Sequence, residues 1–172
     1  MDYVLKTART LDDIPDHADF EALRREWFAV GTKELADLGG PVRTVDQMME
    51  HFWEETQEFL APNGVTVLAL DENGTLLGSG ALRRIGPGIA DLKRLYVRPA
   101  ARGVRLGRAL AEARIAAARQ MGFRTLFTNT ITSNHRMLEI YEGLGFARVP
   151  RFPECHEPIE LDHILIYLRL DL

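Results

Sequence analysis

Residues 92–110 read LKRLYVRPAARGVRLGRAL, and this stretch decides the fold because it joins a strand to a helix through a short basic turn. Backbone N–H groups at the start of a helix lack partners within the helix, so they attract anions, and the helix dipole adds to that attraction. Gly103 and Gly107 let a ligand approach the backbone closely, and Arg102, Arg105 and Arg108 supply positive charge. The turn predicts a pyrophosphate site; the alternative is a glycine-bearing loop with a solvated basic rim.

The strand before this turn carries a second signal. Its apolar residues change parity between Leu92 and Leu95, so the two ends of the strand direct their apolar side chains to different faces. Such a slip predicts a β-bulge near Lys93 and Arg94, where splayed strands leave backbone groups unpaired and accessible to a ligand. The alternative is a strand that is buried on both faces.

Outward from this stretch, the sequence alternates between helical and strand periodicity. We expect helices at residues 18–38, 45–59, 107–121 and 134–142. We expect strands at residues 3–8, 65–70, 76–82, 89–97, 125–129, 146–149 and 163–170. An antiparallel meander joined to a β-α-β unit predicts an α/β protein (an α+β mixed sheet) with helices on both faces of the sheet.

Composition is that of an ordinary globular protein. The chain has 172 residues, which suits one domain spanning 1–172, with 46% apolar and 27% charged residues. The net charge of −4 argues against general nucleic-acid binding, and no segment approaches the ~20 apolar residues of a membrane span. The single cysteine, Cys155, excludes an internal disulfide, and residues 1–10 lack an apolar signal core. We expect a cytoplasmic protein with no nucleic-acid or membrane partner.

Two polar residues of the expected helix at 134–142 lie on one face. Asn134 and Tyr141 are seven residues apart, which is close to two turns and roughly 10 Å along the axis. That span suits an extended ligand arm, with an amide at one end and a reacting group at the other. A phenol has a pKa of ~10 and a thiol ~8.5, so Tyr141 can donate a proton to a leaving thiolate in a nearly balanced transfer. The alternative is a helix cap and a core tyrosine.

Together these motifs resemble the GNAT superfamily of acyl-CoA N-acyltransferases, over about residues 77–149 and more loosely over the first helices. The family's coenzyme A loop, Arg/Gln-x-x-Gly-x-Gly/Ala, is matched by residues 102–107, with Arg105 at the place of the middle glycine. Residues 134–146 resemble the family's Asn…Tyr-Glu-x-x-Gly-Phe segment. The resemblance implies a central, mostly antiparallel twisted sheet of about six to seven strands flanked by about four helices. We expect Arg105 to keep ordinary helical-entry dihedrals, with its N–H directed at the ligand.

The resemblance also implies roles for individual residues. Acetyl-CoA would be the cosubstrate, with no metal, and its thioester arm would pair with the backbone of Leu95, Tyr96 and Val97 like an added strand. Asn134 would hydrogen-bond the pantetheine arm, and Tyr141 would lie near the sulfur as general acid. The pyrophosphate would lie on the backbone of the turn, formed by Arg102, Gly103, Val104, Arg105, Leu106, Gly107 and Arg108.

An attacking amine must lose a proton, and the resemblance points to Asp91 on the central strand as the base, directly or through water. The alternative is a solvent-facing or salt-bridged carboxylate. The loop at 150–158 is expected to border the acceptor site, and its Cys155-His156 pair lacks a metal-ligand pattern. Acidic and aromatic residues of the first two helices are candidates for recruiting a cationic amine, with core packing as the alternative: Glu26, Glu54, Glu55, Trp27, Phe28 and Trp53.

These observations predict an N-acetyltransferase that moves an acetyl group from acetyl-CoA to a primary amine of a small molecule by direct transfer in a ternary complex. Acetylation of a protein lysine or N-terminus, and a non-catalytic acyl-CoA sensor, stay open as alternatives. So does binding of another nucleotide at residues 102–108, although neither G-x-G-x-x-G nor a Walker A motif fits that turn. A homodimer is expected from the habits of the family.

Overall fold

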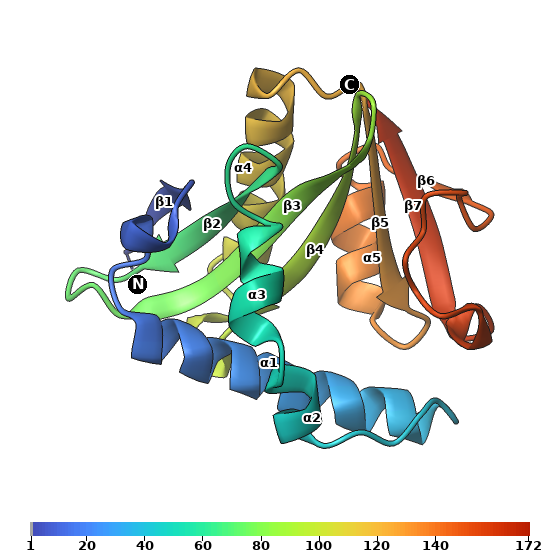
Figure 1. The fold of residues 1–172 in the computed structure, drawn as a ribbon, viewed down its shortest axis with the longest axis horizontal. Helices are drawn as coiled ribbons and strands as arrows, with labels where there is room; N and C mark the ends of the chain where they lie inside the picture. The colour runs from blue at the N-terminus through green and yellow to red at the C-terminus, as the bar shows by residue number, and fades with distance from the viewer. Residues whose placement is uncertain (1) are drawn as a thin grey trace.

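A twisted sheet of seven strands organises the protein, as a computed structural model describing residues 2–172 shows (Figure 1). The strands are β1 (Val4–Ala8), β2 (Gly64–Leu70), β3 (Leu76–Gly86), β4 (Ile89–Val97), β5 (Thr125–Ile131), β6 (Ala147–Val149) and β7 (Leu165–Asp171). The α-helices are α1 (His17–Asp37), α2 (Val45–Met49), α3 (Phe52–Gln57), α4 (Leu106–Gln120) and α5 (His135–Glu142). Short 3₁₀ turns lie at Leu11–Asp13, Pro99–Ala101 and Ile159–Leu161.

The strand order is β1-β2-β3-β4-β5-β7-β6, and every neighbouring pair is antiparallel except β4 and β5. The parallel pair is joined by α4, because a parallel connection needs a crossover. The expected mixed, mostly antiparallel sheet is therefore confirmed. One helix differs from expectation: the helix expected at 45–59 is two short helices, because the backbone of His51 (φ −115°, ψ 21°) leaves the helical region.

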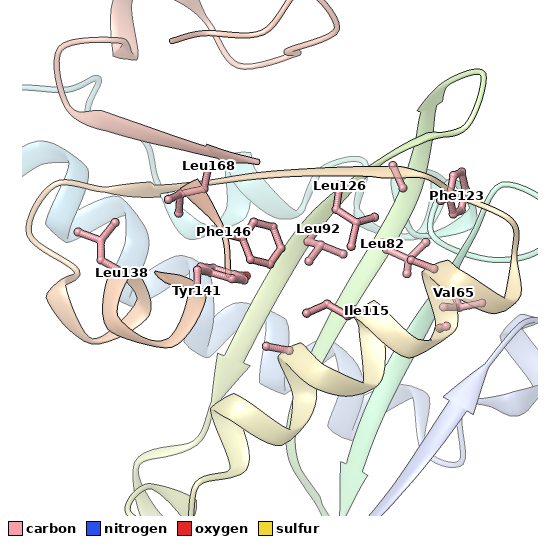
Figure 2. Close-up of a cluster of buried hydrophobic side chains, with 14 residues drawn as sticks. Val65, Leu82, Leu92, Ile115, Phe123, Leu126, Leu138, Tyr141, Phe146 and Leu168 are labelled. Carbon is pink, nitrogen blue, oxygen red and sulfur yellow. The ribbon is translucent and has the colours of Figure 1, made fainter. Parts of the chain in front are cut away.

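Two groups of helices cover opposite faces of the sheet (Figure 1). On one face α4 and α5 pack on β2 to β5 through apolar side chains that include Ile115, Leu126 and Tyr141 (Figure 2). On the other face α1 and α3 pack through Phe20, Leu23 and Phe52. Strand β2 is buried along its whole length because both faces are covered. The central strands are thereby held between two helical layers, which fixes the backbone around the site.

A β-bulge in β4 interrupts the centre of the sheet. Ser79 pairs with Tyr96 and Ala81 pairs with Lys93, so one residue of β3 faces two residues of β4. Arg94 has a φ of 59°, a left-handed conformation that turns the strand at this point. The bulge expected near Lys93 and Arg94 is confirmed.

Beyond the bulge, β4 separates from β5. The parallel pairing runs from Ile89 opposite Thr125 to Leu92 opposite Thr128 and ends there. In Figure 1 the two strands diverge toward the side of the molecule where α1 lies. Within the described part of the chain, the β5-facing edge of β4 from Lys93 onward therefore has no strand partner, and this edge becomes one wall of the site.

Candidate active site

A cleft of about 640 Å³ opens where β4 and β5 separate. Its floor is formed by the central strands at Leu92 to Leu95 and at Thr128 to Ile131, and its sides by α1, α3, α5 and the loop before β7. Trp27 and Phe28 line it from α1, Phe59 from the segment after α3, and His156 and Glu157 from the loop. Helices far apart in the sequence thus meet around one cavity beside the bulge, an arrangement typical of ligand sites.

Arg114 of α4 donates hydrogen bonds to the backbone of both strands at the bulge. Its side chain is completely buried, and its Nη1 donates hydrogen bonds to the carbonyls of Lys93 (3.3 Å) and Ala81 (3.4 Å). Its Nη2 donates to the Tyr141 hydroxyl at 3.0 Å. A Cβ on Gly80 would lie 2.9 Å from Arg114 Nε, so the glycine opposite the bulge makes room for the guanidinium. The guanidinium thus satisfies carbonyls beside the bulge and fixes the tyrosine.

Sequence reasoning missed Arg114, although a signal for it exists. Leu106, Leu110, Arg114 and Ala118 follow one another at intervals of four, which places the arginine within the buried stripe of α4. A charged residue in an apolar stripe needs buried partners, and here backbone carbonyls and Tyr141 supply them.

Tyr141 lines the cleft and is only 3% exposed. Its ring packs edge-on against Phe146 with ring centroids 5.1 Å apart, and Figure 2 shows both rings beside Leu92. Its hydroxyl oxygen accepts the hydrogen bond from Arg114, which leaves the hydroxyl proton available for donation. The residue is therefore placed to act as a proton donor toward the cleft.

Asn134 lies at the other end of α5 and also lines the cleft, so the expected common face of Asn134 and Tyr141 is confirmed. The Asn134 side-chain carbonyl caps the helix by accepting a hydrogen bond from the Met137 N–H at 3.2 Å. Its amide NH₂ group has no hydrogen-bond acceptor among residues 2–172 and can still donate to a ligand. The two interpretations of this residue, cap and ligand contact, are compatible.

The basic turn lies outside the cleft lining, at the start of α4. Gly103 has a φ of 93°, and Arg105 is the N-cap of α4 with φ 61° and ψ 15°. The expectation that Arg105 keeps ordinary helical-entry dihedrals is therefore wrong: the turn imposes the left-handed conformation that glycine adopts without strain. The side chains of Arg102 and Arg108 contact the Val97 carbonyl and Glu112.

Replacing Arg105 by Gly should therefore make the protein more stable than replacing it by Ala. Both changes remove the same charge, but only Gly relieves the left-handed strain of about 1–2 kcal/mol. The greater freedom of an unfolded glycine offsets about 0.4–1 kcal/mol of that gain. Urea unfolding of the two variants measures the difference, which we expect to be up to about 1 kcal/mol. A glycine variant less stable than the alanine variant would contradict the strain.

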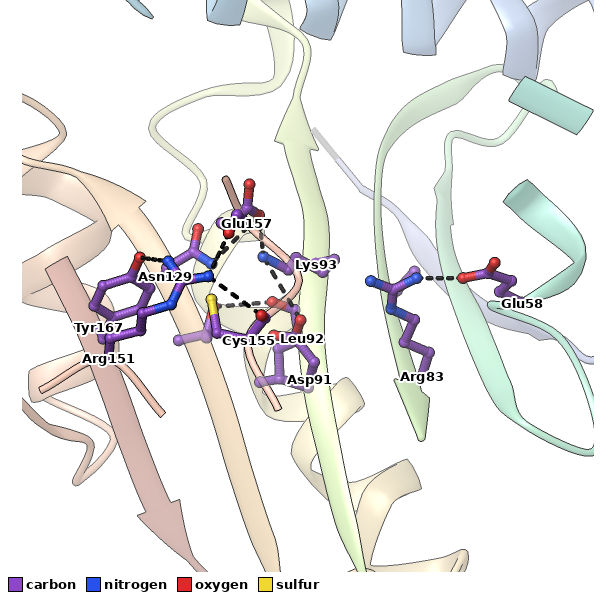
Figure 3. Close-up of polar contacts among 12 residues, drawn as sticks. Glu58, Arg83, Asp91, Leu92, Lys93, Asn129, Arg151, Cys155, Glu157 and Tyr167 are labelled. Atoms are coloured by element: carbon purple, nitrogen blue, oxygen red, sulfur yellow. Dashed lines mark hydrogen bonds and ion pairs between the residues drawn. The ribbon is translucent and has the colours of Figure 1, made fainter. Parts of the chain in front are cut away.

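A carboxylate–lysine cluster lies beside the β4 floor (Figure 3). Lys93 Nζ is 2.5 Å from Glu157 Oε1 and 3.6 Å from Asp91 Oδ2, and Asn129 donates to the same Glu157 oxygen at 3.5 Å. Burial raises the pKa of Asp91, with Lys93 opposing part of that effect. Burial opposes the charged form of Lys93, but the charges of Asp91 and then Glu157 outweigh it and raise the Lys93 pKa. Burial likewise opposes the charged form of Glu157, but Lys93 outweighs it and lowers the Glu157 pKa. Glu157 is therefore held as a carboxylate and Lys93 as a cation.

Asp91, the expected base, does not reach the cleft directly. It is 1% exposed, is absent from the cleft lining, and lies on the far side of Lys93 from Glu157, as Figure 3 shows. Its Oδ1 is buried without a hydrogen-bond partner among residues 2–172. Asp91 has the same parity as Ile89, which packs with Phe152 and Cys155, so the loop after β6 covers this face of the strand. Glu157, which sequence reasoning did not single out, is the carboxylate of this cluster that lines the cleft.

The residues expected to surround an amine are only partly brought together. Trp27, Phe28 and Glu55 line the cleft. Glu26 instead pairs with Arg98, and Glu54 contacts His51 at the surface. Trp53 packs against Phe20 and Phe52, away from the cleft lining.

Residues 2–172 contain no group of three or more His, Cys, Asp or Glu side chains arranged to hold a metal ion. Within the same residues, no helix has the length and apolarity needed to cross a membrane.

Comparison with known proteins places this site in a family. A family model described as the acetyltransferase (GNAT) family matches residues 25–146. A protein of Schizosaccharomyces pombe named as an uncharacterized N-acetyltransferase is 34% identical over 158 residues, covering 91% of this chain and 89% of the relative. An IAA acetyltransferase of Azospirillum brasilense is 33% identical over 104 residues, covering 59% of this chain and 68% of that protein.

Solved structures agree with the fold. An acetyltransferase from Streptococcus agalactiae has a TM-score of 0.75 at 25% identity, with 99% of this chain and 98% of that chain covered. The yncA protein of Salmonella typhimurium, solved with its cofactor acetyl-CoA, has a TM-score of 0.66 at 21% identity, with 99% and 94% covered. Since the family model spans more than half of the sequence, and a relative above 30% identity spans nearly all of it, the chain belongs to the acetyltransferase (GNAT) family and is an acyltransferase.

Proposed function

We propose that this acyltransferase moves an acetyl group from acetyl-CoA directly to a primary amine of a small molecule, in a ternary complex within one domain spanning residues 1–172. The observation that carries the proposal is the bulged end of β4. Among residues 2–172 it offers an unpaired strand edge that runs between the anion turn at the start of α4 and the cleft lined by Tyr141. Family membership supports the acyl transfer, and the acceptor is inferred from the cleft.

The residues present fit coenzyme A. The β5-facing edge of Leu95, Tyr96 and Val97 has no strand partner in residues 2–172, so it can pair with the amides of an extended pantetheine arm. The backbone N–H groups of residues 102–108 lie at the start of a 15-residue helix, where a pyrophosphate gains from the dipole. Asn134 retains an amide donor on the same side as the cleft. When bound, acetyl-CoA supplies the activated acyl group as a thioester.

Tyr141 and the carboxylate–lysine cluster supply the proton transfers. We propose that Tyr141 donates its proton to the departing sulfur, with Arg114 fixing the orientation of the hydroxyl. Glu157 lines the cleft and accepts the amine proton through water, with Lys93 holding it as a carboxylate. Asp91, expected as the base directly or through water, is proposed instead to anchor Lys93 from its buried position.

The size of the cleft favours a small acceptor. Its volume of about 640 Å³ falls within the range of roughly 300–1,000 Å³ that small-molecule sites occupy. Part of this space is required by the acyl end of the cosubstrate. Side chains of α1, α3 and the loop at 156–161 surround the remainder, so an acceptor must fit among them.

The test is the effect of acetyl-CoA on thermal stability, with ATP and NAD as controls. Ligand at 100 times its Kd stabilises by about 2.7 kcal/mol, and each kcal/mol raises Tm by about 2–4 °C at this size. We therefore expect a rise of about 5–10 °C that is specific to acetyl-CoA. Addition of amines should then release free thiol. Equal rises with ATP or NAD would indicate a general nucleotide site, and binding without thiol release for any amine would indicate a non-catalytic sensor.

A further inference from the structure

Three arginines meet at the side of the cleft formed by α1 and α3, and we call Arg24, Arg83 and Arg94 the arginine cluster. Arg83 and Arg94 line the cleft from β3 and from the bulge of β4. They lie over the ring of Phe59, with guanidinium carbons 5.1 and 4.3 Å from its centroid. Arg24 precedes Phe28 by one turn of α1, and its guanidinium carbon is 4.9 Å from the Trp27 ring.

The cluster leaves buried hydrogen-bond donors unused. Arg24 is 2% exposed, and its Nε and Nη1 have no hydrogen-bond partner among residues 2–172. Arg83 Nε is buried and equally unpartnered within those residues. Three of the five unpartnered buried side-chain atoms found there thus belong to two arginines of this one cluster. A buried charge without a partner is strongly unfavourable, so its presence calls for a role other than stability.

The arginine cluster has fewer salt-bridged carboxylates than guanidinium groups. Arg94 pairs with Glu55, which is half-exposed, and donates to Thr56 at 3.2 Å. Arg83 pairs with the exposed Glu58 (Figure 3), while Arg24 has no salt bridge to any residue of the described chain. Two carboxylates therefore form salt bridges within a cluster of three guanidinium groups, while Asp91 and Glu157 act on Arg83 from the neighbouring carboxylate–lysine cluster without forming a salt bridge to it.

The pKa values record the same imbalance. Burial lowers the pKa of Arg24 well below its usual range, and the charge of Arg94 lowers it further. Burial lowers the pKa of Arg94 to about 10, with Glu55 opposing this effect and Arg83 adding to it. Arg94 therefore lies close enough to Arg24 and to Arg83 to be repelled by both, and an anion placed beside Arg94 would be attracted by all three guanidinium groups.

We propose that the arginine cluster binds a carboxylate of the acceptor, so that the acceptor is an amino acid acetylated on its amine. Arg83 and Arg94 contact the carboxylate, because guanidinium groups match the planar fork of a carboxylate, and Arg24 strengthens the positive field from behind them. Arg94 belongs to the bulge itself, so the carboxylate lies near the reacting end of the cleft, as a compact amino acid requires. This inference rests on the proposed function and names its substrate class.

The proposal is tested with matched acceptors that differ only at the carboxylate. Leucine and phenylalanine are each compared with the amino-acid amide and with isoamylamine or phenethylamine, which lack the group. A charge-assisted hydrogen bond contributes about 1.5–3 kcal/mol, so kcat/KM for the free amino acids should be about 10–100-fold higher. Equal or higher kcat/KM for the uncharged analogues would overturn the inference while leaving acetyl transfer intact.

Two variants and one control assign that preference to the cluster. In Arg94→Gln the ratio of kcat/KM between amino acid and amine should fall toward one. Arg24→Met should lower the same ratio by less, since Arg24 acts from a distance. Arg84→Gln is the matched control, because Arg84 neighbours Arg83 on β3 but packs over Phe123, outside the cleft lining. A ratio that stays unchanged in Arg94→Gln would overturn the assignment.

Binding and stability provide readouts that do not depend on turnover. Calorimetry with leucine and coenzyme A should detect leucine binding in the parent protein and its loss in Arg94→Gln, even if no amine is acetylated. Lack of transfer with intact binding would then refute the proposed function alone, and lack of binding would refute the inference. Because two nitrogens of the buried Arg24 guanidinium lack a hydrogen-bond partner among residues 2–172, Arg24→Met should raise Tm by about 2–4 °C. A fall in Tm would show that Arg24 has a structural role instead.

Discussion

Replacing Tyr141 by Phe should lower kcat for acetyl transfer by about 10²–10⁴-fold, the usual contribution of a general acid. The hydroxyl lies in the cleft wall with its oxygen engaged by Arg114, so its proton is the group available for a departing thiolate. Phenylalanine keeps the ring against Phe146 and removes only the oxygen. The KM for acetyl-CoA should change little, because the lost interaction develops in the transition state.

The measurement is free-thiol release under saturating acetyl-CoA and amine, well below the Tm of each protein. Tyr3→Phe serves as the control, since Tyr3 packs in the apolar cluster of β2 and α4, lies outside the cleft lining and also loses one phenolic oxygen. Loss of the Arg114 partner is expected to destabilise Tyr141→Phe by about 1–3 kcal/mol, so both variants are first checked by thermal unfolding. A kcat within threefold of the parent would remove the general-acid role.

The order of elements could be predicted from the sequence because the local signals agree with the tertiary structure. The parity change between Leu92 and Leu95 predicted the bulge, since side-chain alternation in a strand records which face is buried. The seven-residue spacing of Asn134 and Tyr141 predicted their shared face for the same kind of reason. The break at His51 carries no comparable signal, because neither Gly nor Pro marks it.

Features that depend on contacts between residues far apart in the chain could not be predicted from local sequence patterns. Asp91 is buried because the loop after β6 packs over its face of β4, and Glu157 of that loop reaches Lys93 from 64 residues away. The left-handed Arg105 lies where a glycine would have marked the turn, so its residue type hid the conformation. The position of Arg114 within the apolar stripe of α4 indicates that it is buried but not which groups it contacts, and Arg24 looks like an ordinary helical arginine until the surroundings of its guanidinium are known.

Replacing Arg114 by Met should destabilise the protein by about 3–5 kcal/mol, as expected when one partner of a buried charged network is removed. The substitution leaves the carbonyls of Ala81 and Lys93 and the Tyr141 hydroxyl without their donor. Urea unfolding measures the effect, and Arg119→Met on the exposed side of α4 is the matched control, expected within about 0.5 kcal/mol of the parent. Loss of less than about 1 kcal/mol in Arg114→Met would show that the bulge does not depend on this cation.

Gly80→Ala tests the same contact from the opposite strand. Its new Cβ would lie 2.9 Å from Arg114 Nε, so the guanidinium must move, and both stability and kcat should fall together.

Arg114→Met and Arg24→Met make the same change at two fully buried arginines, yet the stabilities of the two variants should shift in opposite directions. Arg114 donates to four acceptors, whereas Arg24 leaves two nitrogens unpartnered among residues 2–172. Burial is alike in the two, so the sign of each shift reports whether the cation serves the fold or the ligand.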